Sequence, residues 1–313
     1  MPSFQDFTYL SSNGKTRIHA RKCIPDGAPR AVIQIVHGIA EHINRYDDFA
    51  RFLAEHGFVA VGEDHLGHGQ TAETKEDLGF FAEEDGWNCV VNDLNLLRDQ
   101  MHGEYPDLPY LFFGHSMGSF LVRTYLIRFP DKYDAAIISG TGQQSPALVL
   151  GGLAAAQFLV RSKGARADGQ VLNDMAFGTY CKRIPDARTT SDWVSRDRET
   201  VDKYLADPLC GFVAKVGLFR DMMSGIRFIS SQKNIDRMNK EAPVYFMSGE
   251  EDPVGDYGAG VERAYRAFCR AGLKDVMIRL YPGGRHEMLN EINREDVYRD
   301  ILNWLESKMG KIS

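Results

Sequence analysis

The sequence predicts an α/β protein in which a mostly parallel sheet is covered by helices on both faces. Short β-branched or aromatic runs alternate with helical periodicities along most of the 313 residues, as they do where crossover helices join parallel strands. The runs are apolar at consecutive positions, which is typical of strands buried on both faces. The rhythm breaks over roughly residues 143–240, where helical periodicity continues without a buried strand.

Each element follows from its own local pattern. Residues 4–24 alternate and contain Asn13-Gly14, which predicts a hairpin with an Asn-Gly turn. A helix over 46–56 stops at Gly57, a residue type that commonly follows a helix C-terminus. Buried strands are predicted at 31–36, 58–61 and 110–113, and further strands at 135–139, 244–248 and 276–281. Further helices are predicted at about 87–101, 120–126, 260–271 and 294–308.

The strand-poor block predicts an insertion into the core. Ligands in open α/β sheets bind beyond the carboxyl ends of the strands, and an insertion is expected to cover that edge. The predicted division is a core of residues 1–142 and 240–313 with an insertion over 143–239. Within the insertion, the apolar runs 147–150 and 153–160 predict an apolar helix.

Composition excludes several classes of protein. The formal net charge is −6, and no basic stripe is present to neutralise phosphates, so nucleic acid is not expected as a partner. Five scattered cysteines without C-x-x-C pairs are typical of a reducing compartment and not of a disulfide framework or zinc site. The first residues lack the basic and apolar regions of a signal peptide, so a cytoplasmic location is expected.

The most specific motif is Gly-His-Ser-Met-Gly at 114–118, between a predicted strand and a predicted helix. A serine at such a joint fits the nucleophile elbow, G-x-S-x-G. The sharp turn strains the backbone of Ser116, and its close neighbours Gly114 and Gly118 must lack side chains. The serine oxygen then lies at a helix N-terminus, where free N–H groups favour developing negative charge.

A serine hydroxyl needs a base, and the base needs an orienting acid, in the chain order Ser, Asp or Glu, His for this architecture. His286 is the only histidine after Ser116 and follows the last predicted strand. The acid is expected in the loop after 244–248. Asp252 is the first choice there, and Asp256 and Glu251 remain alternatives.

An acyl-transfer site also needs N–H groups that hold the negative oxygen. The backbone N–H of Met117, the residue after the nucleophile, is one expected donor. The second is expected from Ile39, in the loop after strand 31–36, where Gly38 permits close approach. The residues expected to support this geometry are His37, Gly38, Glu41, His42 and His115, with His37 as a structural hydrogen-bonding group and Glu41 and His42 fixing the shape of the loop.

A metal site is the weaker alternative. Asp64, His65 and His68 lie close in sequence, but their spacing is not that of a helical two-His site and no clear third ligand follows. Gly67 and Gly69 favour a tight loop instead, so no metal and no cofactor are expected.

Together these motifs resemble the α/β-hydrolase superfamily, and within it the monoacylglycerol lipase and lysophospholipase-like branch. The resemblance rests on the motifs at 37–42, 64–69, 114–118 and 249–252, on Arg45-Tyr46 and on His286. It implies an α/β-hydrolase fold, with a mostly parallel eight-stranded sheet, helices on both faces and a helical cap, or lid, formed by 143–239.

The chain departs from the family pattern at one position. Ser119 stands where the family often has the last Gly of G-H-S-M-G-G, and this change on the helix is expected to leave catalysis intact. Prolyl-aminopeptidase relatives carry Trp where Met117 stands, which argues against peptide substrates.

The expected function is therefore hydrolysis of carboxylic esters, monoacylglycerol or lysophospholipid-like with a medium or long acyl chain, through an acyl-enzyme on Ser116. A small-ester carboxylesterase or a thioesterase remains open, as does a non-catalytic ligand-binding member of the fold. The expected partner is a small-molecule or lipid ester, with possible transient contact between the cap and a membrane surface.

Overall fold

The computed structural model describes residues 1–312, and the side chains of residues 1–310. Its centre is one eight-stranded sheet in the order β1-β2-β4-β3-β5-β6-β7-β8. The strands are β1 (Ser3–Leu10), β2 (Arg17–Ile24), β3 (Ala31–Val36), β4 (Phe58–Glu63), β5 (Tyr110–His115), β6 (Ala135–Ser139), β7 (Val244–Gly249) and β8 (Val276–Tyr281). The predicted eight-stranded, mostly parallel sheet is confirmed. Only the β1–β2 and β2–β4 pairings are antiparallel, and the other five are parallel.

Ten α-helices and five short 3₁₀ helices connect the strands in the described chain. The α-helices are α1 (Asp47–Glu55), α2 (Gly86–Glu104), α3 (Met117–Arg128), α4 (Pro146–Lys163), α5 (Gln170–Phe177), α6 (Arg198–Ala206), α7 (Val216–Ile229), α8 (Gln232–Ile235), α9 (Ala259–Arg270) and α10 (Arg294–Ile312). The 3₁₀ helices are η1 (Ile43–Tyr46), η2 (Gly69–Thr71), η3 (Lys75–Asp77), η4 (Tyr180–Arg183) and η5 (Met288–Asn290).

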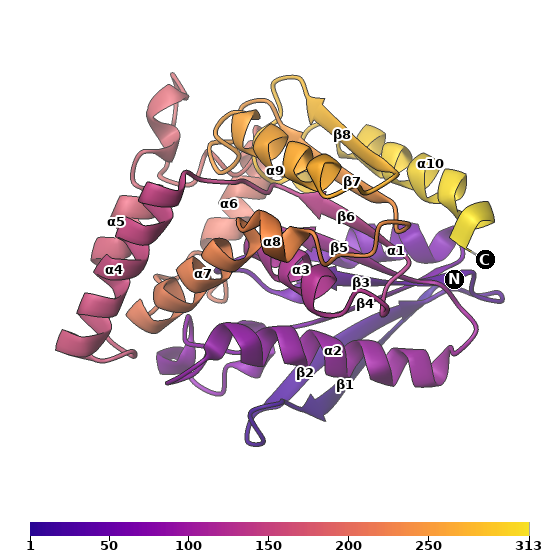
Figure 1. Ribbon diagram of the computed structural model, residues 1–313, viewed down its shortest axis with the longest axis horizontal. Coiled ribbons are helices and arrows are strands. Elements are labelled where there is room, and N and C mark those ends of the chain that lie inside the picture. The colour runs from indigo at the N-terminus through magenta and orange to yellow at the C-terminus, as the bar shows by residue number, and fades with distance from the viewer. Residues whose placement is uncertain (313) are drawn as a thin grey trace.

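The two faces of the sheet build two separate cores, because side chains alternate along each strand. On β3, Val32 and Val36 join the core that α2, α3 and α9 cover. Ile33 and Ile35 on the same strand join the core that α1 and α10 cover. Figure 1 shows these helices on either side of the sheet. Such two-sided cover explains why β3 to β7 are buried at every position, whereas β8, at the edge of the sheet, is buried only at Tyr281.

The first hairpin differs from expectation in its turn. β1 and β2 pair antiparallel as predicted, with Leu10 opposite Arg17, so six residues connect them and not two. The side chain of Asn13 accepts hydrogen bonds from the backbone N–H groups of Lys15 (2.8 Å) and Thr16 (2.9 Å). These bonds stabilise a wider loop, in which Gly14 takes the positive φ of 71°.

Between β6 and β7 the described chain contains helices and no strand longer than an isolated bridge. We call residues 143–239 the insertion. Its first helix, α4, begins at Ser145, whose hydroxyl accepts a hydrogen bond from Leu148 N–H, and Pro146 occupies the first turn. Figure 1 shows α4, α5 and α7 gathered beyond one end of the sheet. No helix in the described chain combines the length and apolarity that a membrane span requires.

Candidate active site

Ser116 lies at the sharp joint between β5 and α3. Its backbone has φ 54° and ψ −123°, a conformation that is costly for a residue with a side chain. A side chain at Gly118 would place its Cβ 2.0 Å from Val36 O, and one at Gly114 would lie 2.7 Å from Gly118 O. Strand and helix therefore approach this closely only because both positions are glycine, as the elbow motif predicts.

Two further loops at the same edge bring His286 and Asp252 together. His286 follows β8, Asp252 follows β7, and the His286 Nδ1 atom lies 3.0 Å from both carboxylate oxygens of Asp252. Asp252 also accepts hydrogen bonds from the Ser248 hydroxyl (3.0 Å) and from Val254 N–H (2.9 Å). The carboxylate is fully buried, and these three donors hold it in one position.

The two alternative acids lie elsewhere. Asp256 is paired with Arg263 at 3.0 Å, and its side chain is 53% exposed. Glu251 is exposed, and its backbone N–H donates to Gly284 O. Of the three candidate acids, Asp252 is the one that contacts the imidazole.

The electrostatics of this pair favour its charged form. Burial alone would raise the pKa of Asp252, but the His286 imidazole and the other donors hold that pKa below its ordinary value. Burial lowers the pKa of His286, yet the carboxylates of Asp252, Glu287 and Glu41 outweigh burial and raise it. An imidazole in such a field can accept a proton and retain it briefly.

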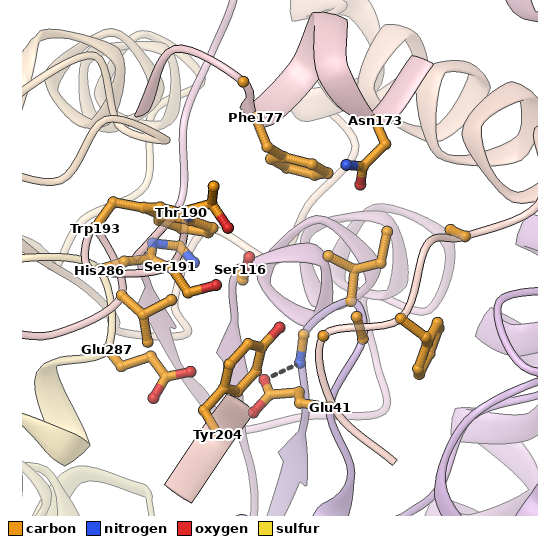
Figure 2. A pocket seen from close by; sticks show the side chains of 18 of the residues that line it. Glu41, Ser116, Asn173, Phe177, Thr190, Ser191, Trp193, Tyr204, His286 and Glu287 are labelled. Atoms are coloured by element: carbon orange, nitrogen blue, oxygen red, sulfur yellow. Dashed lines mark hydrogen bonds between the residues drawn. The ribbon is translucent and has the colours of Figure 1, made fainter. Parts of the chain in front are cut away.

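Ser116 and His286 line one cavity of about 270 Å³ between the strand ends and the insertion. In Figure 2, Ser116 lies beside His286 at the cavity floor, Trp193 is next to His286, and Phe177 projects above from α5. The core contributes eight lining residues: Gly38, Ile39, Ala40, Glu41, His115, Ser116, His286 and Glu287. The insertion supplies the remaining wall, including Asn173, Phe177, Thr190, Ser191, Trp193, Tyr204 and Phe212.

The loop after β3 is held by Glu41. The carboxylate of Glu41 accepts hydrogen bonds from Gly38 N–H (2.5 Å) and from the Tyr46 hydroxyl (2.9 Å), and it pairs with Arg45 (2.6 Å). Figure 2 shows the Gly38 bond. This loop carries Ile39 along the cavity wall. On the opposite side Met117 begins α3, so its N–H has no partner within the helix.

His37 is a buried neutral imidazole. Its Nδ1 lies 2.7 Å from Gly38 O, to which it donates, and its Nε2 accepts from His65 N–H at 3.1 Å. Burial, followed by the neighbouring histidines, lowers the pKa of His37 well below its ordinary value. The ring therefore joins the loop after β3 to the loop after β4.

The polar groups of the loop after β4 are used to hold that loop. The Asp64 carboxylate contacts His19 Nδ1 at 2.8 Å and accepts from Ile43 N–H (2.9 Å) and Gln70 N–H (2.8 Å). His68 Nδ1 lies 3.0 Å from Leu66 O. In the described residues, Asp64, His65 and His68 do not gather their ligand atoms as a metal-binding group.

Sequence reasoning missed the insertion residues that fix His286. The ring of Trp193 lies 5.0 Å from that of His286, centroid to centroid. The backbone N–H of Glu287 donates to Val194 O at 2.8 Å, and the Glu287 carboxylate pairs with Arg45 at 2.6 Å. No local pattern around Trp193 signals these contacts, because they depend on how a distant segment folds back over the sheet.

An eight-stranded sheet of this order, with a strained serine at an elbow and a buried His–Asp pair on the following loops, defines an α/β-hydrolase. The chain belongs to the family described as serine aminopeptidase, S33, whose pattern matches residues 27–293. Within this fold it is similar to lipases and esterases. It is a carboxylic-ester hydrolase of the lipase/esterase kind and monoacylglycerol lipase-like.

Several similar proteins support that statement over nearly the full length of the chain. The chain is 29% identical to a monoacylglycerol lipase of Mycolicibacterium smegmatis, covering 95% of each chain, and 25% identical to human monoglyceride lipase, covering 97% of this chain and 92% of that one. Among solved structures it resembles a thermostable carboxyl esterase from Bacillus coagulans in complex with glycerol. That match has 30% identity and a TM-score of 0.91, and it covers 98% of this chain and 99% of that one.

Proposed function

We propose that this protein hydrolyses monoacylglycerols or similar lipid esters of medium or long acyl chain, through an acyl-enzyme on Ser116. The observation that carries the proposal is the shared cavity, where Ser116 and a buried His286–Asp252 pair meet beneath the insertion. The lipase names of the relatives from M. smegmatis and human agree with this substrate class.

The chemistry follows from the residues present. His286 takes the proton from Ser116 Oγ as that oxygen attacks the ester carbonyl, and later gives the proton to the leaving alcohol. Asp252 holds the imidazole in one tautomer and stabilises its charged form. The N–H groups of Ile39 and Met117 hold the oxyanion, and water then releases the acid by the same route.

The cavity is lined by both apolar and polar side chains, which supports a substrate that combines an acyl chain with a small polyol. Phe177 and Trp193 lie parallel, 6.1 Å apart between ring centroids, and Phe212 adds a further apolar surface. Asn173 and Thr190 offer hydrogen-bonding groups to the same cavity. The apolar rings suit an acyl chain, and the amide and hydroxyl suit the hydroxyls of a glycerol.

The outer surface of the insertion supports transient contact with a lipid surface. Val149, Leu153 and Ala156 bury one side of α4. Large apolar side chains remain exposed on α4 and α5, namely Leu148, Leu150, Phe158, Val171 and Met175, with Phe158 69% exposed. An apolar surface of this kind is typical of a docking site.

A chain-length series tests the substrate. We expect kcat/KM to rise from p-nitrophenyl acetate to the octanoate, and 1-monooleoylglycerol to be hydrolysed. A strict preference for acetate would favour the small-ester carboxylesterase. Faster turnover of acyl thioesters than of the matching oxygen esters would favour the thioesterase. A wild-type protein without any ester turnover would indicate the non-catalytic binding member of the fold.

A further inference from the structure

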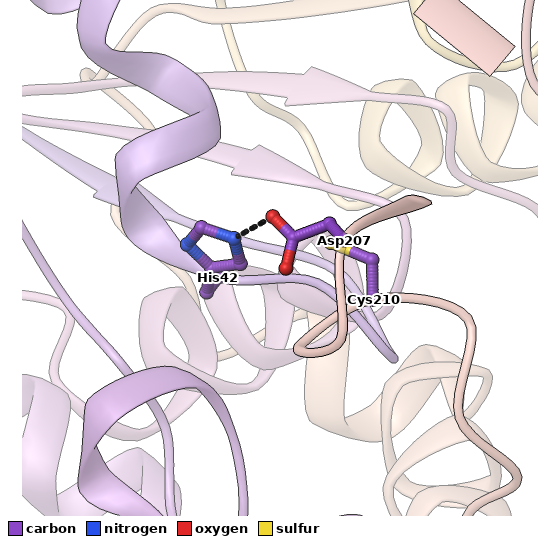
Figure 3. Close-up of side chains that lie close together, drawn as sticks. All are labelled: His42, Asp207 and Cys210. Carbon is purple, nitrogen blue, oxygen red and sulfur yellow. Dashed lines mark hydrogen bonds and ion pairs between the residues drawn. The ribbon is translucent and has the colours of Figure 1, made fainter. Parts of the chain in front are cut away.

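Three side chains with metal-binding atoms meet where the insertion touches the loop after β3. His42 ends that loop, and Asp207 and Cys210 lie on one turn that follows α6. Cys210 N–H donates to Asp207 O at 3.0 Å, and Leu209 N–H donates to the Asp207 carboxylate at 2.8 Å. This Asp-Pro-Leu-Cys turn places the carboxylate and the thiol side by side, facing the imidazole (Figure 3).

The donor atoms lie close to the spacing that a tetrahedrally coordinated metal ion needs. His42 Nε2 lies 2.9 Å from Asp207 Oδ2, and one donor atom from each of the three residues lies within 4.8 Å of the others. Bonds of about 2.0 Å to nitrogen and oxygen and about 2.3 Å to sulfur place these donors roughly 3.3–3.5 Å apart. The imidazole and carboxylate would separate slightly, and the thiol, which lies within 4.8 Å of both, would take a position about 3.5 Å from each.

The surroundings favour a cation over an anion. His42 and Cys210 are each only 8% exposed, so a bound ion is largely shielded from competing water. Three carboxylates stand near the thiol, those of Asp207, Glu41 and Glu287, against the single guanidinium of Arg45. Arg45 already pairs with both glutamates, at 2.6 Å each, which leaves the charge of Asp207 available.

We propose that His42, Asp207 and Cys210 form a binding site for a thiophilic divalent cation such as Zn²⁺, whose occupation inhibits the enzyme. His42 Nε2, a carboxylate oxygen and the sulfur supply three ligands, and water takes the fourth position. The Cys210 S–H bond breaks and its proton leaves to solvent as the sulfur–metal bond forms. The proton on His42 Nε2 moves to Nδ1 through solvent, which frees the Nε2 lone pair for the metal. No oxidation state changes in these steps.

Inhibition follows from what the site joins. Gly211 N–H, next to Cys210, donates to Ala40 O at 2.9 Å. Ala40 has φ 55°, and it lies between His42 and the proposed oxyanion donor Ile39. Rearrangement of the three ligands around the ion shifts this short strained loop, whereas an oxyanion donor works only at 2.7–3.1 Å from its target. This consequence rests on the proposed function, while the metal site itself does not.

Cobalt(II) tests the site without reference to activity. Co²⁺ added to the metal-free protein is expected to give thiolate-to-metal absorption and the strong visible bands of four-coordinate cobalt, and Zn²⁺ is expected to abolish them. Cys210→Ser should lose the thiolate band. His42→Gln, which keeps a donor toward Asp207 but lacks the imidazole ligand, should weaken binding by more than the roughly 10–100-fold that loss of an outer-shell partner costs. Cys269→Ser, which removes an exposed thiol on α9, should bind as the wild type does.

Absence of a thiolate band in the wild type, or its persistence in Cys210→Ser, would overturn the site. Circular dichroism checks that Cys210→Ser folds, and His42→Gln gives an independent answer if it does not. In the second arm, saturating Zn²⁺ should lower wild-type kcat about tenfold or more, but change His42→Gln less than twofold relative to its own metal-free activity. Bound Zn²⁺ without inhibition would refute the coupling to the oxyanion loop.

Discussion

In the proposed mechanism, the reactivity of Ser116 depends on two residues that lie far from it in sequence. His286 is the proposed base, and Asp252 contacts its Nδ1 at 3.0 Å from a fully buried position. A carboxylate without water around it stabilises a neighbouring imidazolium more strongly than an exposed carboxylate does. Both the identity of the acid and the protonation of the base can therefore be tested by single substitutions.

Exchange of the acid separates Asp252 from its nearest alternative. Asp252→Asn should lower kcat by about 10⁴-fold, because the amide favours the wrong imidazole tautomer. Asp256→Asn is the matched control, since Asp256 is exposed and pairs only with Arg263, and it should stay within threefold of wild type. Steady-state kinetics on one p-nitrophenyl ester compares the two, and equal activities would refute the assignment of Asp252.

The raised pKa of His286 predicts the acid limb of the pH–rate profile. The base must be neutral to accept a proton, so kcat/KM should fall as the pH drops through an apparent pKa above 6.5. Burial lowers the pKa of His286, and Asp252 is the main charge that opposes this effect. In Asp252→Asn the pKa of His286 should therefore fall, and the acid limb should move to lower pH. A limb that stays in place in Asp252→Asn would contradict this account, and Asp256→Asn should leave it unchanged.

At the scale of elements, the elbow depends on how closely α3 packs on β3 and β5. The carbonyl oxygen of Val36 occupies the space that a Gly118 side chain would need. The same helix is buried almost throughout, so it cannot move away without opening the core. Ser119 adds a hydrogen bond of 2.5 Å from its hydroxyl to Ser116 O, which a glycine at this position would lack.

Alanine at Gly118 should damage both fold and function. We expect Gly118→Ala to lower the free energy of unfolding by about 1–3 kcal/mol and to abolish most ester turnover. Gly151→Ala is the matched control, because its Cβ would meet nothing within 4 Å on α4, and it should stabilise the protein by about 0.5–1 kcal/mol. Urea unfolding of both variants checks this, and a Gly118→Ala protein as stable as wild type would contradict the packing argument.

Elements encoded by nearby residues could be predicted from the sequence, and the cavity wall could not. The strands at 31–36, 135–139 and 276–281 have the predicted bounds, because a short run of mainly β-branched and apolar residues leaves few alternatives. The residues of the elbow and of the loop after β3 also follow from local motifs. Trp193, Phe177 and Tyr204 line the cavity through the path of the insertion, and no periodicity in their own segments indicates it.

At the scale of the whole molecule, the sheet carries buried polar networks away from the proposed active site. Glu63 ends β4 and accepts a hydrogen bond from Tyr9 on β1, and Asp93 on α2 accepts one from Ser11 at 2.8 Å. Burial, more than the neighbouring charges, raises the pKa of Glu63 to about 8 and that of Asp93 to about 7. Glu63 thus joins the first hairpin to β4, and Asp93 joins it to α2.

The stability of the fold should therefore decrease toward alkaline pH through Glu63. In the unfolded chain Glu63 ionises near its ordinary pKa of 4.5, whereas the folded protein resists ionisation up to about 8. Its contribution is complete below pH 4.5 and is lost as the pH rises to 8, an effect of a few kcal/mol. Glu63→Gln, which can still accept from Tyr9, should show a flatter decrease in urea midpoint over this range.

The exposed Glu295 on α10 provides the control for this measurement. Glu295→Gln should keep the wild-type dependence of the urea midpoint on pH. If Glu63→Gln and wild type lose stability in parallel between pH 5 and pH 8, the carboxyl of Glu63 ionises freely in the folded protein and its proposed role is wrong.

The central claim, that Ser116 is a nucleophile activated by His286, is tested most directly by covalent labelling. A fluorophosphonate should modify wild-type protein once, and peptide mass spectrometry should place the adduct on Ser116. Ser116→Ala should not be labelled, and His286→Ala should be labelled at a rate lower by several orders of magnitude. An adduct on another residue, or undiminished labelling of Ser116→Ala, would contradict the claim.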